Sequence, residues 1–185
     1  MNQQVSFTRM KDGTRAEYDL ISEHDLANAG QMADRMLAAL RSMDGPSPYR
    51  ISRLEHCLQS ASRAERDGAS DEMIAVALLH DIGDVFGPLN HSQVAAAILR
   101  PYVSEQSWWI VQHHGLFQGY YWFEHYNRNP DERDRYRDHP HYEATVAFCE
   151  NWDQNCFDPA YRSKPLEYFE PLVRELFARQ PNGFV

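Results

Sequence analysis

An adjacent histidine and aspartate, His80 and Asp81, follow the apolar stretch 73–79. A neutral imidazole and a carboxylate both bind divalent and trivalent metal ions. Neighbouring residues of an α-helix point about 100° apart, so His80 can bind one ion while the two oxygens of Asp81 turn toward a second. An unpaired aspartate at the end of an apolar helix would be costly to bury. The pair therefore predicts a metal site.

Further histidines and an aspartate recur along the chain at separations of about one helix and one loop. Successive helices of a bundle can each direct one such side chain at a common centre. Six protein ligands are more than a four-coordinate zinc ion requires, and they suit two octahedral ions that share the carboxylate of Asp81. The candidate ligands are His56, His80, Asp81, His91, His114 (or its neighbour His113, which is equally suited by residue type) and Asp153. The other histidines, His24, His125, His139 and His141, are interpreted as ordinary core or surface residues.

The composition limits the classes of partner. Among 185 residues, 27 acidic and 18 basic side chains give a formal charge of −9, which disfavours nucleic acid and anionic membranes as partners. No apolar stretch approaches the roughly 20 residues that span a bilayer, and residues 1–11 lack the apolar core of a signal peptide. Three cysteines without a Cys-x-x-Cys pair are typical of reduced thiols. We therefore expect a cytoplasmic protein that acts on a small molecule, and the oligomeric state stays open.

Apolar periodicity and capping residues predict one mostly helical domain over residues 1–185. Ser70 has the features of a helix start, and Gly68 those of a helix end. The turn 11–13, within residues 1–21, predicts a short β-hairpin or an N-terminal extension. Residues 127–139 are polar and mixed in charge, which favours a solvated loop. Helices are expected over residues 22–42, 51–67, 70–79, 90–99, 104–114, 116–126, 140–152 and 165–178.

The order His, His-Asp, His, His, Asp resembles the HD-domain superfamily of metal-dependent enzymes. The stretches Leu54-Glu55-His56-Cys57-Leu58-Gln59 and Gly68-Ala69-Ser70-Asp71-Glu72-Met73, running into Leu78-Leu79-His80-Asp81-Ile82-Gly83, are similar to the HD-domain mixed-valence di-iron oxygenases. That family includes organophosphonate-cleaving enzymes and, more distantly, myo-inositol oxygenase. The similarity is dense over residues 54–83 and continues as spaced ligands to Asp153. It implies an all-α HD-domain helical bundle, a dinuclear Fe(II)/Fe(III) centre and O2 as co-substrate.

The resemblance also assigns the six ligands to two ions. Asp81 would bridge them, and the register of the family favours His114 over His113. An open position on the second ion would take a substrate hydroxyl, so Asp81, His91 and His114 are the expected catalytic residues. The first ion would be bound by His56, His80, Asp81 and Asp153, and the second by Asp81, His91 and His114.

Three positions depart from the family pattern at expected substrate contacts. Asp84 stands where the family has a histidine, Gln118 where it has a lysine, and Glu150 where it has an arginine. Two cationic contacts to a phosphonate are therefore missing at their usual places, and two acids are added. Tyr49 lies near the place of an iron-binding tyrosine, although in a different register.

The changed contacts point to a substrate that carries a cation. Aromatic rings and carboxylates attract a quaternary ammonium group, and rings crowd around His114 at Trp108, Trp109, Phe117, Tyr120, Tyr121, Trp122 and Phe123. The alternative is that these rings pack between helices. We expect a 1-hydroxy-2-aminoalkylphosphonate, specifically the N-trimethylated form, which oxidative C–P cleavage would convert to glycine betaine and phosphate. The candidate substrate-binding residues are Tyr49, Asp84, Gln118, Tyr121, Glu150, Arg162 and Lys164.

A second interpretation is a metal-dependent HD-domain phosphohydrolase that acts on a small phosphate ester or nucleotide. Histidine and carboxylate ligands also accept manganese, magnesium or zinc, and a dinuclear centre can activate a hydroxide for hydrolysis. The ligands alone leave this choice open. A regulatory module that has lost its chemistry would be expected to lack some of the ligands, and none is lost here.

Overall fold

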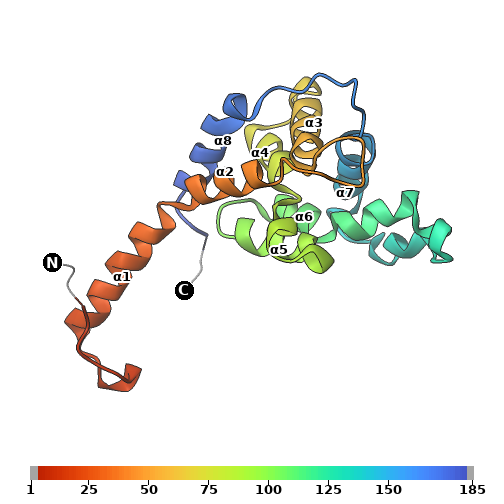
Figure 1. Ribbon diagram of the computed structural model, residues 1–185. Helices are drawn as coiled ribbons and strands as arrows, with labels where there is room; N and C mark the ends of the chain where they lie inside the picture. Colours follow the sequence, from red (N-terminus) through yellow and green to blue (C-terminus); the bar gives the residue numbers. More distant parts are fainter. Residues whose placement is uncertain (1–3, 183–185) are drawn as a thin grey trace.

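The computed structural model describes residues 4–182, and within this range the chain forms helices and no β-strand (Figure 1). The prediction of an all-α fold is confirmed. In chain order the elements are η1 (Met10–Asp12), α1 (Arg15–Ala29), α2 (Met32–Ser42), α3 (Arg53–Arg66), α4 (Asp71–Leu79), η2 (Ile82–Val85), η3 (Pro88–Asn90), α5 (His91–Leu99), α6 (Glu105–Gln118), η4 (Gly119–Tyr121), η5 (Phe123–Tyr126), η6 (Pro130–Tyr136), α7 (Tyr142–Phe148), the π-helical turn η7 (Cys149–Asp153) and α8 (Leu166–Ala178).

Helix α4 forms the centre of the fold. It packs against α3, α6 and α8 (Figure 1), and every residue from Ile74 to Leu79 is buried. A helix that is apolar on all sides is stable only when neighbours surround it. The apolar sequence of α4 therefore requires the central position that the helix occupies. The helix ends at His80, and the residues that follow therefore emerge inside the protein.

Serine hydroxyls cap the start of α4 and of two helices that pack against it. Ser52, Ser70 and Ser104 each accept a hydrogen bond from the backbone amide three residues later, at the starts of α3, α4 and α6. Gly68, just beyond the end of α3, has a φ of +74°, which favours glycine. Both the Ser70 cap and the Gly68 stop agree with the sequence prediction.

The prediction of a β-hairpin near the N-terminus is wrong for the residues described. Residues 10–12 form a short 3₁₀ turn, and Thr14 then begins α1 with a capping box in which Glu17 bonds back to the Thr14 backbone. This Thr-x-x-Glu signal outweighs the turn at residues 11–13. Helix α1 extends away from the remaining helices (Figure 1) and has no buried residue.

Two other predicted boundaries are also wrong. The helix expected over residues 22–42 is interrupted at Gly30 and Gln31, so that α1 and α2 are separate. The break expected at Gly115 does not occur, because α6 continues through it to Gln118. Gly115 is instead a point of close approach, where a Cβ atom would lie 2.7 Å from the Ser92 hydroxyl of α5.

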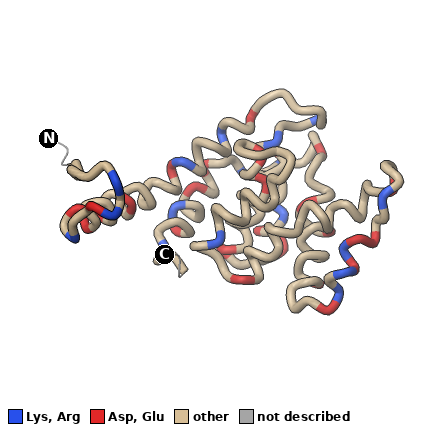
Figure 2. Tube along the Cα trace, turned by 90° about the horizontal axis from the view of Figure 1, so that it is seen from below, with Lys and Arg blue, Asp and Glu red and all other residues tan. Residues whose placement is uncertain are grey.

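The polar segment 127–139 is more ordered than a solvated loop. It contains the 3₁₀ helix η6, which packs against α6 and η4. Its acidic and basic residues alternate along the chain, and across the described residues Lys and Arg do not gather into one patch (Figure 2). None of the described helices is both long and apolar enough to cross a membrane.

Gly83 sets the distance between the turn η2 and helix α5. A Cβ atom at this position would overlap the carbonyl of His91 and lie 2.9 Å from the backbone nitrogen of Ala95. Only glycine allows the two backbones to approach this closely. As a result Asp81, two residues earlier, is held beside His91.

We expect Gly83→Ala to lower the free energy of unfolding by about 2 kcal/mol or more, because the added methyl group must push two backbones apart. Urea denaturation followed by circular dichroism measures this change. Gly45→Ala is the control, since no atom lies within 4 Å of a Cβ at Gly45. Equal effects of the two substitutions would contradict the close-approach argument.

Candidate metal centre

The structure brings all six candidate ligands together from separate elements. They form three overlapping groups in which the ligand atoms lie within 4.8 Å of one another. His91 is half-buried, and the other five are buried. His56 comes from α3, His80 and Asp81 from the end of α4, His91 from the first position of α5, His114 from α6 and Asp153 from the end of η7.

The carboxylate of Asp81 divides this cluster into two sets. Its Oδ2 lies 3.6 Å from Nε2 of both His56 and His80. Its Oδ1 lies 3.2 Å from Nε2 of His114 and 3.4 Å from Nε2 of His91. One oxygen therefore faces each pair of imidazoles, which is the arrangement of a carboxylate that bridges two ions.

Asp153 completes the first set. Its Oδ1 lies 3.3 Å from Nε2 of His56 and 3.7 Å from Nε2 of His80. Its Oδ2 is buried and has no hydrogen-bond partner among the described residues. A buried carboxylate oxygen without a partner is rare and costly, and a cation at this position would satisfy it.

Backbone carbonyls fix the protonation of three imidazole rings. Nδ1 donates to the carbonyl of Cys156 at 3.0 Å in His56, of Ala77 at 2.8 Å in His80, and of Val111 at 2.7 Å in His114. A carbonyl only accepts hydrogen bonds, so Nδ1 carries the proton and Nε2 presents a lone pair to the cluster. This is the tautomer that binds a metal through Nε2.

The inward-facing lone pairs require a positive charge between them. Nε2 of His56 and Nε2 of His80 lie only 3.2 Å apart, and two neutral acceptors at this distance repel. Bonds of about 2.1 Å to one ion place adjacent ligand atoms roughly 3 Å apart, which is close to the spacing within each set. The residues present therefore fit a dinuclear metal centre.

Charges within the cluster shift the pKa values of its members in opposite directions. Burial acts to lower the pKa of His56 and His80, but the carboxylates of Asp81 and Asp153 outweigh it and raise both. Burial acts to raise the pKa of each carboxyl, but the facing imidazoles outweigh it and lower both. The same field that favours protonated imidazoles favours metal cations, which must displace those protons to bind.

Of the two adjacent histidines on α6, only His114 reaches the cluster. The ring of His113 stacks on Trp109 with centroids 3.8 Å apart, and its Nδ1 donates to the Trp109 carbonyl at 3.0 Å. His139 stacks on the opposite side of Trp109. The choice that residue type alone left open is thus decided by helix geometry, because neighbours on α6 point in different directions.

Two adjacent cavities lie beside the cluster. The inner cavity, of about 160 Å³, is bounded by five of the ligands, and the outer cavity has a volume of about 490 Å³. Tyr49, Gln118, Trp122 and Phe157 line both of them, so the two cavities are adjacent. The outer cavity is further lined by Tyr121, Tyr126 and Gln154.

Three of the candidate substrate contacts lie at these cavities, and four do not line them. Tyr49 and Gln118 line both, and Tyr121 lines the outer one. Asp84 forms an ion pair with Arg53 at the edge of the cluster, and Glu150 is exposed at the start of η7 behind Tyr121. Arg162 is exposed.

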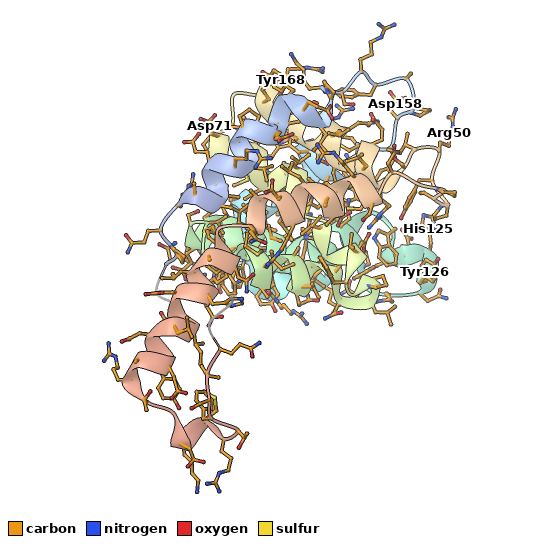
Figure 3. All side chains as sticks on the ribbon, turned by 60° about the vertical axis from the view of Figure 1, so that its left-hand side comes forward. Arg50, Asp71, His125, Tyr126, Asp158 and Tyr168 are labelled. Carbon is orange, nitrogen blue, oxygen red and sulfur yellow. The ribbon has the colours of Figure 1, made fainter. Side chains whose placement is uncertain are left out.

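Lys164 lies on a different side of the protein. Its Nζ is 4.5 Å from the ring centroid of Tyr168 on α8. Figure 3 shows Tyr168 far from Tyr126, which marks the outer cavity. The structure therefore does not bring Lys164 to either cavity.

Sequence reasoning missed two residues that shape the inner cavity. Arg53 precedes His56 by three residues on α3. Residues at this spacing lie on the same face of a helix, which would have predicted Arg53 beside the cluster. Phe157 stacks on the His56 ring with centroids 4.5 Å apart and contacts Tyr49. Phe157 lies in the irregular segment after η7, where no periodic pattern could identify it.

A helical fold whose buried histidines and aspartates converge on one point is typical of metal-dependent proteins. Comparison with known families agrees. The sequence model of the HD domain family matches residues 53–146, just over half of the chain, and the protein belongs to this family. Its members are generally metal-dependent enzymes.

The resemblance to the HD-domain superfamily is therefore confirmed. The matched region holds His56, His80, Asp81, His91 and His114, whereas Asp153 lies beyond its end. No curated protein matches the sequence.

We expect His114→Ala to bind one metal ion per chain where the unaltered protein binds two, because the first set of ligands stays intact. Asp81→Ala should lose both ions, since the bridging carboxylate belongs to each set. Elemental analysis after dialysis measures these ratios. His113→Ala is the matched control and should keep both ions, because its ring lies outside the cluster. Two ions retained in His114→Ala would contradict the assignment.

Proposed function

We propose that this protein is a di-iron oxygenase that uses O2 to cleave the C–P bond of a 1-hydroxy-2-aminoalkylphosphonate. The specific substrate proposed is 1-hydroxy-2-(trimethylammonio)ethylphosphonate, and the products are glycine betaine and phosphate. One observation carries the proposal: the cluster that Asp81 divides into two sets borders an inner cavity, and an outer cavity lined by aromatic rings lies next to it.

The reaction balances with one O2 for each substrate molecule. The C–P bond and the C–H bond at the hydroxyl-bearing carbon break, and that carbon is oxidised to a carboxylate. One oxygen atom of O2 enters the carboxylate and the other enters the phosphate. A mixed-valence iron pair, when bound, would supply the redox chemistry with O2.

The exposure of the ligands supports substrate entry at the second set. His91 lines the inner cavity with a side-chain exposure of 27%, whereas His80 is fully buried. The first set has three of its own ligands, and the second has only two besides the shared Asp81. The second set therefore has room for a substrate group, which supports catalytic roles for Asp81, His91 and His114.

The aromatic lining of the outer cavity supports a quaternary ammonium group on the substrate. Tyr49, Tyr121, Trp122 and Tyr126 remain between 37% and 71% exposed although they are large rings. Exposed aromatic side chains that gather at one cavity are typical of a binding site, and their faces attract a trimethylammonium group. Burial and the charge of Glu150 raise the pKa of Tyr121, whereas Arg133 acts to lower it.

The other rings near His114 have structural roles. Phe117 and Phe123 are buried in the core. Trp109 is enclosed between two histidine rings, and Trp108 lies beneath the guanidinium of Arg100. The packing interpretation thus holds for these four, and the binding interpretation is retained for Tyr121 and Trp122.

Gln118 offers a polar contact where the two cavities meet. Its Oε1 is buried and has no hydrogen-bond partner in the described part of the chain. The amide can accept a hydrogen bond from a substrate hydroxyl, and such an acceptor would orient the substrate between the cluster and the rings.

A phosphohydrolase that acts on a small phosphate ester or nucleotide is the second candidate. The presence of Arg53 beside the cluster favours it, because guanidinium groups bind phosphate well, and aromatic rings could stack on a nucleobase. The same ligands accept zinc, manganese or magnesium. The two candidates differ in their need for O2.

We expect the iron-loaded protein to release phosphate from the trimethylated substrate only when O2 is present, with one O2 consumed per phosphate. Trp122→Leu should raise KM about tenfold through loss of a cation–π contact, with a smaller effect on the unmethylated amine. Phosphate release and O2 uptake are measured together. Tyr168→Leu, an exposed ring on the far side, is the control and should leave KM unchanged.

Absence of phosphate release under O2 would contradict the oxygenase proposal. Hydrolysis of phosphate esters without O2, by protein that contains two zinc or manganese ions, would assign the second function instead.

A further inference from the structure

Arg53 places a positive charge at the edge of the metal cluster. It is the first residue of α3, one turn before His56. One of its guanidinium nitrogens forms an ion pair with Asp84 and lies 3.1 Å from Oδ2 of Asp81. The side chain is 25% exposed and lines the inner cavity. The guanidinium therefore faces both the carboxylates and the space that a substrate would enter.

No other lysine or arginine among the described residues lines either cavity. Arg133 is stacked on the ring of Tyr120 and lines neither cavity. An anionic group that enters from the outer cavity would thus meet a single protein cation, and it would meet it next to the two sets of ligands.

Asp84 holds this cation in place and is not free to bind a cationic substrate. It follows Asp81 by three residues on the 3₁₀ turn η2, where residues i and i+3 align. Besides the ion pair with Arg53, its Oδ1 lies 3.5 Å from Nδ1 of His91. Asp84 is therefore already in contact with the Arg53 guanidinium on one side and the His91 ring on the other.

Metal binding would release part of the guanidinium for another anion. When the oxygens of Asp81 bind two cations, they no longer need the ion pair with Arg53. The guanidinium has five N–H donors in one plane, and Asp84 uses only part of this set. The remaining donors match two oxygens of a phosphonate or phosphate group.

We propose that Arg53 binds the phosphonate group of the substrate and that Asp84 is the positioning residue for Arg53. The substrate then lies with its anionic end in the inner cavity and its quaternary ammonium group among the rings of the outer cavity. This orientation rests on the proposed function for the identity of the substrate, but the phosphate of an ester would be bound by the same contact.

The test is calorimetric titration of methylphosphonate into the anaerobic, metal-loaded protein, with iron or with whichever metal elemental analysis assigns. We expect Arg53→Gln to weaken binding at least tenfold, because a charge-assisted bidentate contact is lost. Arg53→Lys should weaken it less, since the charge remains without the planar fork. Arg50→Gln is the matched control, because Arg50 lies three residues earlier and points outward (Figure 3).

A second titration, with tetramethylammonium, tests the orientation. We expect Trp122→Leu to weaken tetramethylammonium binding and Arg53→Gln to leave it unchanged. For methylphosphonate we expect Arg53→Gln to weaken binding and Trp122→Leu to leave it unchanged. Asp84→Asn should weaken methylphosphonate binding less than Arg53→Gln does.

Three outcomes would overturn the proposal: unchanged methylphosphonate binding in Arg53→Gln with full metal content, loss of the metal ions in that variant, or equal weakening of both probes. Neither titration involves turnover, so a protein that fails to react with O2 still gives a clear answer about Arg53.

Discussion

The carboxylate of Asp81 is the interaction on which the rest of the structure depends. It is buried at the end of an entirely apolar helix, between two pairs of imidazoles that present lone pairs to it. An ionised carboxylate in such a place requires compensating positive charge. Helices α3, α5 and α6 supply three of the imidazoles, and the end of α4 supplies the fourth, His80. Backbone carbonyls fix the tautomers of three of these rings, and Gly83 allows α5 to come close enough for His91 to take part. Together these features fit cations on both sides of Asp81.

The surroundings of this centre are graded from polar to aromatic. Ionisable groups and Arg53 bound the inner cavity, whereas rings and two amides line the outer one. A molecule with an anion at one end and a bulky, weakly hydrated cation at the other would match both regions at once. This complementarity links the metal chemistry to the choice of substrate, because the reacting carbon of such a molecule lies between its two ends and would be held next to the ligands.

The sequence predicted which histidines and aspartates converge, because these residue types recur at the spacing of one helix and one loop. Ser70 and Gly68 marked real helix ends through local hydrogen bonds and backbone conformation. Other features depended on tertiary contacts. Gly115 looked like a helix break, but its missing side chain serves the approach of Ser92 from α5. Asp84 looked like a free acid, and only the fold reveals that Arg53 neutralises it. Phe157 lies in an irregular segment, so no periodic pattern could predict its position. Lys164 is near Asp153 in sequence but contacts α8, and this contact could not be predicted from the sequence alone.

The most direct test of the central claim is a crystal structure of the metal-loaded protein with anomalous diffraction recorded at the absorption edge of the bound metal. We expect two anomalous peaks about 3.5–4 Å apart, one beside His56, His80 and Asp153, the other beside His91 and His114, with Asp81 bonded to both. A single peak, or two peaks that Asp81 does not join, would contradict the account.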